Sequence, residues 1–278
     1  MPSFEAGDGR TLYYRDTDPL AGAERHSVVL LHGWACHGGY FDRQVDGLSD
    51  RRRLIIPDLR GHRHSHRASD RPTLEVLAAD LQALLDHLRL RHPVLLGWSM
   101  GALVGFEFIR RYTDDALAGL IVVDMTPRVV NGAGWDLGLL GGFGAAQAER
   151  AFDLIGQDWP GWVDAFLPSV FAGSRSPDAD LAQWMATEMR ASDPAAMAAL
   201  WQAMTNADHR AVLPTVAVPT LVVRGAESQL YGPATADRLA GSIPNATLAT
   251  VPQAGHAPHL EQPEHTNGLF AGFVDGLE

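Results

Sequence analysis

Five consecutive residues, Gly97-Trp98-Ser99-Met100-Gly101, have the types and the order that nucleophilic chemistry needs. They follow the apolar run Pro93-Val94-Leu95-Leu96 and precede an amphipathic stretch over 102–112. A G-x-S-x-G motif between a strand and a helix is typical of a nucleophile elbow, a tight turn that exposes the serine hydroxyl. The hydroxyl would also face the positive end of the following helix. Ser99 is therefore the candidate nucleophile; the plainer interpretation is a glycine-rich turn with an incidental serine.

A serine hydroxyl is a weak nucleophile until a base takes its proton. The chain has 12 histidines, so position must choose among them. His256 lies in Gln253-Ala254-Gly255-His256-Ala257-Pro258, directly after the last apolar β-type run. Reactive groups of a doubly wound sheet gather at the carboxyl ends of its strands, where this loop would fall. We therefore expect His256 to be the general base, the alternative being a histidine of a surface loop.

The elements that must position these residues alternate between strand and helix signals. Continuous apolar runs suited to burial on both faces predict strands, and residues at helical spacing predict helices. The strands are expected at 11–15, 27–32, 53–57, 93–97, 119–124, 218–224 and 246–251, with helices at 73–88, 102–112, 233–241 and 263–275. This alternation predicts an α/β fold with a doubly wound, mostly parallel sheet.

The alternation stops between about residues 127 and 213. Helical segments replace the strands there, at 145–156, 159–171, 178–190 and 194–205. We predict a helical cap over 127–213, inserted into a core domain made of 1–126 and 214–278. The stretch holds five of the seven tryptophans: Trp135, Trp159, Trp162, Trp184 and Trp201. Each alone is explained by the cap's own core, but as a group they favour a small apolar or aromatic substrate.

Composition excludes several classes of function. The net charge of −11 argues against nucleic acid or an anionic membrane as a partner. All 22 basic residues are arginine, so Schiff-base and lysine-assisted lyase chemistry are excluded. Cys36 is the only cysteine, which rules out an internal disulfide and a thiolate metal cage. With no signal-peptide pattern and no run of 18 apolar residues, we expect a soluble, cytoplasmic protein; the oligomeric state is left open.

Two further groups of residues have types that can do chemistry. His62, His64 and His66 alternate, and on a strand they would share a face and could bind a metal. They follow Arg60-Gly61 in a loop that also carries arginines, so we expect solvated loop histidines and no metal. Cys36 and His37 are adjacent, and neighbours in sequence rarely face each other. We interpret them as pocket lining.

Taken together, these features resemble the α/β-hydrolase superfamily, in its subset of small capped serine esterases and perhydrolases (cofactor-free haloperoxidases). Besides the elbow and Gly255-His256, the matching segments are Leu31-His32-Gly33-Trp34, Pro57-Asp58-Leu59-Arg60-Gly61-His62, Leu120-Ile121-Val122-Val123-Asp124 and Val218-Pro219-Thr220-Leu221-Val222-Val223. They run in the family's order over essentially the full length. The resemblance implies the α/β-hydrolase fold and an oxyanion hole made by the backbone N–H groups of Trp34 and Met100. It implies no metal or organic cofactor.

The acid that orients the base departs from the family's pattern. Most members place an aspartate three residues after the glycine that ends the 218–224 strand. Here that glycine is Gly225, and the position holds Ser228. Asp124 ends the strand after the elbow, a site that some members use instead, and Glu227 stands one residue from the usual place. Its position at a strand's carboxyl end favours Asp124 as the third triad member, and Glu227 is the alternative. The plainer interpretation of Asp124 is that its side chain only caps a turn.

The leading hypothesis is a serine hydrolase that cleaves a carboxylic ester, lactone or thioester through an acyl-enzyme. Ser99 excludes family enzymes that carry aspartate at the elbow, such as epoxide hydrolases and haloalkane dehalogenases. The absence of lysine excludes the family's hydroxynitrile lyases. A cofactor-free, quinolone-type ring-cleaving dioxygenase that uses the His256/Asp124 pair stays as an alternative, although such enzymes usually carry histidine where Met100 stands. A ligand receptor built on the same fold is the other alternative.

Overall fold

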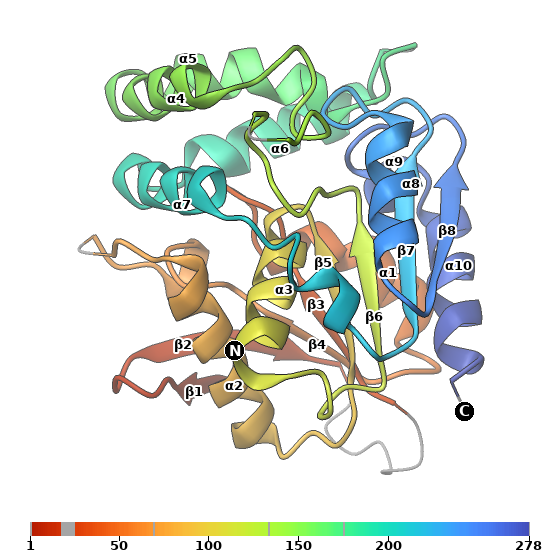
Figure 1. Cartoon of the computed structure of the whole chain (residues 1–278). Helices are drawn as coiled ribbons and strands as arrows, with labels where there is room; N and C mark the ends of the chain where they lie inside the picture. The colour runs from red at the N-terminus through yellow and green to blue at the C-terminus, as the bar shows by residue number, and fades with distance from the viewer. Residues whose placement is uncertain (1, 18–25, 69, 133, 175, 278) are drawn as a thin grey trace.

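The computed structural model describes residues 2–17, 26–68, 70–132, 134–174 and 176–277. Among them lies an eight-stranded sheet with the order β1-β2-β4-β3-β5-β6-β7-β8 (Figure 1). The pairs β1–β2 and β2–β4 are antiparallel and all the others are parallel. The strands are β1 (Ser3–Glu5), β2 (Thr11–Asp16), β3 (Val28–Leu31), β4 (Leu54–Pro57), β5 (Val94–Trp98), β6 (Gly119–Val123), β7 (Thr220–Gly225) and β8 (Ala246–Val251). The predicted doubly wound, mostly parallel α/β sheet is confirmed.

Helices cover both faces of this sheet. Every residue of β3, β5 and β6 is buried, as continuous apolar runs require of strands enclosed on both faces. In Figure 1, α2 (Leu74–Leu88) and α3 (Met100–Tyr112) lie in front of the sheet, while α1 (Asp42–Leu48) and α10 (Pro263–Asp275) lie behind it. The helices α8 (Pro233–Ser242) and α9 (Pro258–Glu261) flank β8 in sequence. The loops at the carboxyl ends of the central strands are thereby held on a rigid frame.

Four helices interrupt the alternation between β6 and β7. They are α4 (Ala145–Gln157), α5 (Trp159–Phe166), α6 (Ala179–Arg190) and α7 (Pro194–Asn206), and we call them the α4–α7 segment. The carboxylates of Asp158, Asp178 and Asp193 cap the last three by accepting backbone N–H groups. The helix predicted over 159–171 ends at Phe166 and continues as a 3₁₀ turn to Val170. Figure 1 shows the segment above the sheet, over the ends of β5 and β6 where the elbow lies.

None of the helices described here is long and apolar enough to span a lipid bilayer.

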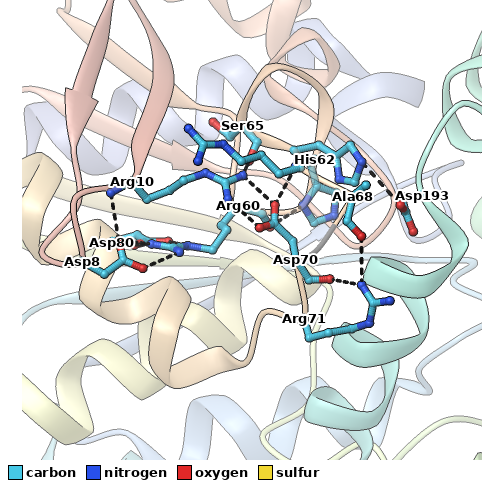
Figure 2. Close-up of polar contacts among 12 residues, drawn as sticks. Asp8, Arg10, Arg60, His62, Ser65, Ala68, Asp70, Arg71, Asp80 and Asp193 are labelled. Carbon is cyan, nitrogen blue, oxygen red and sulfur yellow. Dashed lines mark hydrogen bonds and ion pairs between the residues drawn. The ribbon is translucent and has the colours of Figure 1, made fainter.

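Buried ion pairs hold the described parts (residues 58–68 and 70–72) of the 58–72 loop, which follows β4. Arg10 makes two hydrogen bonds to Asp70, both at 2.7 Å, and its guanidinium also donates to Ser65 O. Arg60 reaches Asp80 at 2.7 and 2.8 Å and contacts Asp8 on its other side (Figure 2). Bidentate arginine–carboxylate pairs hold both partners in one orientation. These ion pairs therefore fix the positions of Arg60 and Asp70 relative to the core.

Candidate active site

Ser99 stands at the turn between β5 and α3. Its φ of 52° and ψ of −121° are sparsely populated for a residue with a side chain. Two glycines leave room for the turn: a Cβ on Gly97 would lie 2.5 Å from the backbone N of Ala102, and one on Gly101 would overlap the carbonyl group of Leu31. The strained turn places Ser99 at the N-terminus of α3, where the helix dipole favours negative charge. This is the arrangement of a nucleophile elbow.

Two backbone N–H groups are available beside this serine. Met100 follows it directly, and the loop after β3 approaches so closely that a Cβ on Gly33 would lie 3.4 Å from the Ser99 Cβ. Within the described ranges, neither the Trp34 N–H nor the Met100 N–H donates to another protein group. Uncommitted donors next to a nucleophile can stabilise an oxyanion, because they need no rearrangement when the charge develops.

The loop that carries Trp34 is held from two sides. Leu59 in the 58–72 loop donates its N–H to His32 Nε2 at 2.9 Å, and His32 Nδ1 therefore carries the proton and donates to Gly33 O at 2.8 Å. Burial lowers the pKa of His32 well below its usual value, so this ring stays neutral. From the other side, the Trp34 indole N–H donates to Met197 O in α7 at 2.9 Å. The position of the Trp34 backbone thus depends on both the core and the α4–α7 segment.

His256 lies in the loop between β8 and α9, and its surroundings fix its backbone. Its N–H donates to Val170 O at 2.8 Å, and its carbonyl oxygen accepts the Trp98 indole N–H at 2.8 Å. Gly255 is needed for the close approach, because a Cβ there would lie 2.6 Å from the backbone N of Ala172. The side chain is 4% exposed. Trp98, the residue before Ser99, is therefore hydrogen-bonded to His256, the residue expected to act as the general base.

Asp124 and Glu227, the two carboxylates considered for the acid, lie in different surroundings. Asp124 follows β6, is 4% exposed, and its Oδ2 lies 2.8 Å from His256 Nδ1. Its φ of 44° is in the left-handed region that aspartate tolerates better than most residues. Glu227 instead accepts hydrogen bonds from the N–H and hydroxyl groups of Ser174 at the surface. The structure thus brings Asp124 to His256 and points Glu227 elsewhere.

A mostly apolar cavity opens beside these groups. Ser99 and His256 line it together, with Cys36 and Tyr231 as the other polar side chains. Its walls come from the core loops, from α5 and the 3₁₀ turn that follows it (Leu167–Val170), and from α6 and α7. The residues that form them are Trp34, Trp98, Trp201, Phe166, Met125, Met185, Met189, Met204, Val129, Val170, Leu139 and Leu230. No charged side chain of the described residues lines it. Such a cavity suits an uncharged, apolar group, and flexible methionines adapt to its shape.

A larger open groove lies between α2, α3 and α7, but neither Ser99 nor His256 lines it. The groove is the larger of the two, but Ser99 and His256 line only the smaller cavity. We therefore take the smaller cavity as the candidate active site.

The five tryptophans of the cap predicted over 127–213 have different roles. Trp135 precedes the α4–α7 segment and donates its indole N–H to Arg128 O at 2.9 Å. Trp201 lines the cavity. Trp159 packs against Trp34, and Trp162 packs against Trp201. Trp184 packs on Tyr40. The expectation of an aromatic substrate pocket therefore rests on Trp201 together with two core residues, Trp34 and Trp98.

The alternating histidines are not brought together. His62 Nδ1 faces the carbonyl oxygens of Leu59 and Arg60, whereas His64 pairs with Asp58 and His66 with Asp193. Among the described residues, no group of three potential ligands could hold a metal ion. The prediction that these are solvated loop histidines is wrong for His62, which is 1% exposed. Burial lowers the pKa of His62 to about 4, although the two backbone carbonyls that it faces favour the protonated ring.

The adjacent residues Cys36 and His37 point to different places. Cys36 lines the cavity, as expected, but burial raises the pKa of its thiol far above the usual value. A protonated thiol is a poor nucleophile. His37 does not line this cavity; its Nε2 lies 3.0 Å from the Glu188 carboxylate on α6. Cys36 is therefore pocket lining, and His37 belongs to a contact between the core and the α4–α7 segment.

Sequence reasoning missed three residues that hold the site together. Trp98 donates to His256 O, His32 positions the loop of Trp34, and Ser228 donates its hydroxyl proton to Asp124. Trp98 and His32 lie in the quoted motifs without any sign of these roles, whereas Ser228 lies outside them and gave a signal only as the residue that replaces the usual aspartate.

Comparison with known proteins gives a consistent result. The sequence pattern of the alpha/beta hydrolase fold matches residues 26–263. The chain is 30% identical over 254 residues to the pimeloyl-[acyl-carrier protein] methyl ester esterase of Xanthomonas axonopodis pv. citri, covering 89% of this chain and 94% of that protein.

Solved structures similar to this one include two esterases. The esterase from Exiguobacterium antarcticum superposes with a TM-score of 0.89 at 23% identity, covering 98% of both chains. The thermophilic esterase from Thermogutta terrifontis superposes with a TM-score of 0.85 at 27% identity, covering 99% of this chain and 98% of that one.

Proposed function

From the premise that this chain belongs to the alpha/beta hydrolase fold family, we propose that it hydrolyses carboxylic esters through a Ser99-His256-Asp124 triad. The observation that carries the proposal is the buried 2.8 Å contact between His256 Nδ1 and Asp124 Oδ2, beside a cavity that Ser99 and His256 share. The class of enzyme is a carboxylic ester hydrolase, in keeping with the esterases to which the chain is similar.

In the proposed reaction, the Ser99 hydroxyl attacks the ester carbonyl while His256 Nε2 takes its proton. Asp124 accepts the hydrogen bond from Nδ1 and so fixes the tautomer and stabilises the imidazolium. The carbonyl oxygen becomes an oxyanion, which the N–H groups of Trp34 and Met100 stabilise. His256 then protonates the leaving alcohol. Water attacks the acyl-enzyme by the same relay and releases the acid. No step requires a metal or an organic cofactor.

The α4–α7 segment is proposed to act as the cap of the site, with core residues 1–126 and 214–278 carrying the reacting groups. It supplies much of the apolar wall of the cavity, including Phe166, Met185 and Trp201. We propose a small apolar or aromatic ester as substrate, because no charged side chain of the described residues is available in the wall to pair with a charged group. A methyl ester on an apolar acyl chain is the first class to test; lactones and thioesters share the chemistry.

The experiment is p-nitrophenyl ester hydrolysis by purified variants. Ser99→Ala should reduce turnover to background, whereas Ser169→Ala, a serine that bonds Phe166 O in the α4–α7 segment, should not. Asp124→Asn should lower kcat by roughly 10³–10⁴-fold, and Glu227→Gln should leave it within about twofold because its carboxylate faces Ser174. Equal losses in the two acid variants would reject the assignment of the acid.

The same preparations distinguish the alternative functions. Ring opening of a heteroaromatic substrate in air without ester turnover would identify a cofactor-free dioxygenase. Tight retention of a ligand with negligible turnover would identify a receptor. Neither alternative has support from the named relatives, which are esterases.

A further inference from the structure

Ser228 occupies the position where the family's usual aspartate would stand, three residues after Gly225. Its Oγ lies 2.7 Å from Asp124 Oδ2 and donates to it. That same oxygen lies 2.8 Å from His256 Nδ1. One carboxylate oxygen thus accepts from both the base and Ser228, while Oδ1 receives, among the described residues, a long contact of 3.4 Å from the Gly225 N–H.

The direction of the Ser228 hydroxyl proton is determined by its other neighbours. The backbone N–H groups of Leu230 and Tyr231 approach Ser228 Oγ at 3.4 and 3.3 Å. A serine hydroxyl has one proton and two acceptor lone pairs. Because both N–H groups occupy the acceptor side, the proton is left for Asp124. The loop after β7 therefore presents a fixed donor to the carboxylate.

Asp124 needs such a donor. It is buried, and an ionised carboxylate away from water is costly unless hydrogen bonds replace its hydration. Its backbone is in the left-handed region, and among the described residues the next helix or strand begins only at Ala145, so no regular element continues from Asp124 to fix its side chain. A carboxylate that rotated by even one rotamer would lose His256.

We propose that Ser228 is a positioning residue of the triad: it holds Asp124 Oδ2 against His256 Nδ1 and replaces the carboxylate that most relatives carry at this place. The inference rests on the proposed ester hydrolysis. It also explains how the acid can be attached to β6 while the loop after β7 keeps a role in the site.

Three titratable side chains of the described residues lie near the pair. The Glu261 carboxylate accepts the N–H groups of Gly255 and Ala172. The other two, Tyr231 and His259, keep one charge over the working pH range. Tyr231 packs on the His256 ring, and burial together with the Asp124 charge raises the pKa of its phenol. His259 lies beyond Trp98, and burial with the nearby His256 lowers its pKa to about 3. A change of the pH–rate profile on mutation of Ser228 is therefore attributable to the Ser228–Asp124–His256 contacts.

The first test compares Ser228→Ala with Ser174→Ala, which removes a hydroxyl from the surface carboxylate Glu227. Ser228→Ala should lower kcat/KM roughly 10- to 100-fold, mainly through kcat, because it removes a hydrogen bond to a charged group. The acid limb of its pH profile should move to lower pH, since a His256 imidazolium that has lost part of its contact with the Asp124 carboxylate releases its proton more readily. Ser228→Thr should restore most of the rate, and Ser174→Ala should match wild type.

The second test moves the acid. Asp124→Asn should be almost inactive, and Asp124→Asn combined with Ser228→Asp should recover at least 10-fold, because a carboxylate at 228 would start beside the position of Asp124 Oδ2. If Ser228→Ala does not fold, the comparison of Asp124→Asn with the double variant tests the role of Ser228. A Ser228→Ala enzyme with the wild-type rate and pH profile, or a double variant no better than Asp124→Asn, would overturn the inference.

The outcomes separate the inference from the function on which it rests. Full ester turnover in Ser99→Ala, or none in wild type, rejects the proposed function and the positioning role with it. Ester turnover that is present in wild type, lost in Asp124→Asn and unchanged in Ser228→Ala rejects only the role of Ser228.

Discussion

Gly101 is the residue at which a single methyl group should do the most damage to the site. A Cβ at this position would overlap Leu31 O, lie 2.6 Å from the carbonyl carbon of Leu31 and lie 2.9 Å from its Cβ. Two of these three atoms are backbone of β3, in the middle of the sheet, and cannot rotate away. For Gly101→Ala, the start of α3 must therefore move away from β3 by roughly 0.5–1 Å to reach ordinary contact distances.

The magnitude follows from two opposing effects. Overpacking of this kind costs about 1–3 kcal/mol, and alanine's better helix propensity returns at most about 1 kcal/mol. We expect Gly101→Ala to lower the free energy of unfolding by about 1–2 kcal/mol. The larger effect is on activity: a displacement of this size moves Ser99 and the Met100 N–H relative to the Trp34 loop, and a misplacement of about 1 Å costs roughly 100-fold in kcat.

Urea unfolding and p-nitrophenyl ester kinetics measure the two effects separately. Gly105→Ala, in the same helix, is the matched control, because its Cβ would lie 3.3 Å from Leu95 Cδ2 and 3.7 Å from Leu120 Cδ1, both ends of flexible side chains. That variant should keep its kcat within about twofold and its stability within about 1 kcal/mol. A Gly101→Ala enzyme with wild-type kcat, or a control that loses as much, would refute the reasoning.

Two other perturbations test how the site is supported. Trp34→Phe keeps an aromatic ring but loses the indole bond to Met197 O; we expect about a tenfold fall in kcat with little change in KM, measured by steady-state kinetics, and an unchanged kcat would show that α7 does not position the oxyanion loop. His259→Phe tests a pH effect: both ring nitrogens of His259 lack partners among the described residues, and its pKa is lowered to about 3 by burial. The unfolded chain takes up a proton as the pH falls below about 6.5 while the folded chain does not, so the folded state loses stability from there down to about pH 3. Between pH 7 and 5 wild type should therefore lose about 2 kcal/mol more than His259→Phe in urea unfolding, and identical losses would contradict the burial of a neutral ring.

The buried strands of the core were predictable because their signal is local. β3, β5 and β6 are continuous apolar runs, and the elbow is identified by its own glycines. β1 and α1 were not predicted, because β1 has only three residues at the sheet edge and α1 buries only Gln44 and Leu48. Their stability comes from neighbours that are distant in sequence, which no local pattern reports.

The part of the site that lies in sequence motifs was predictable. Ser99 and His256 follow from strand ends, but the choice between Asp124 and Glu227 depends on the path of the loop after β7. The Glu227 N–H donates to Ala254 O, and its carboxylate meets Ser174, 53 residues earlier in the chain. Spacing along the sequence holds no information on that contact. The burial of His62 was missed for the same reason, since the backbone carbonyls around it are placed by the folded loop.

The most direct test of the account is covalent labelling with a fluorophosphonate, which reacts with serines activated by a neighbouring base. Mass spectrometry of wild-type protein should locate a single stoichiometric adduct on Ser99. The adduct should disappear in His256→Ala and persist in Ser228→Thr. A wild-type chain that takes up no label at Ser99, or a His256→Ala variant labelled as fast as wild type, would contradict the claim that His256 activates Ser99.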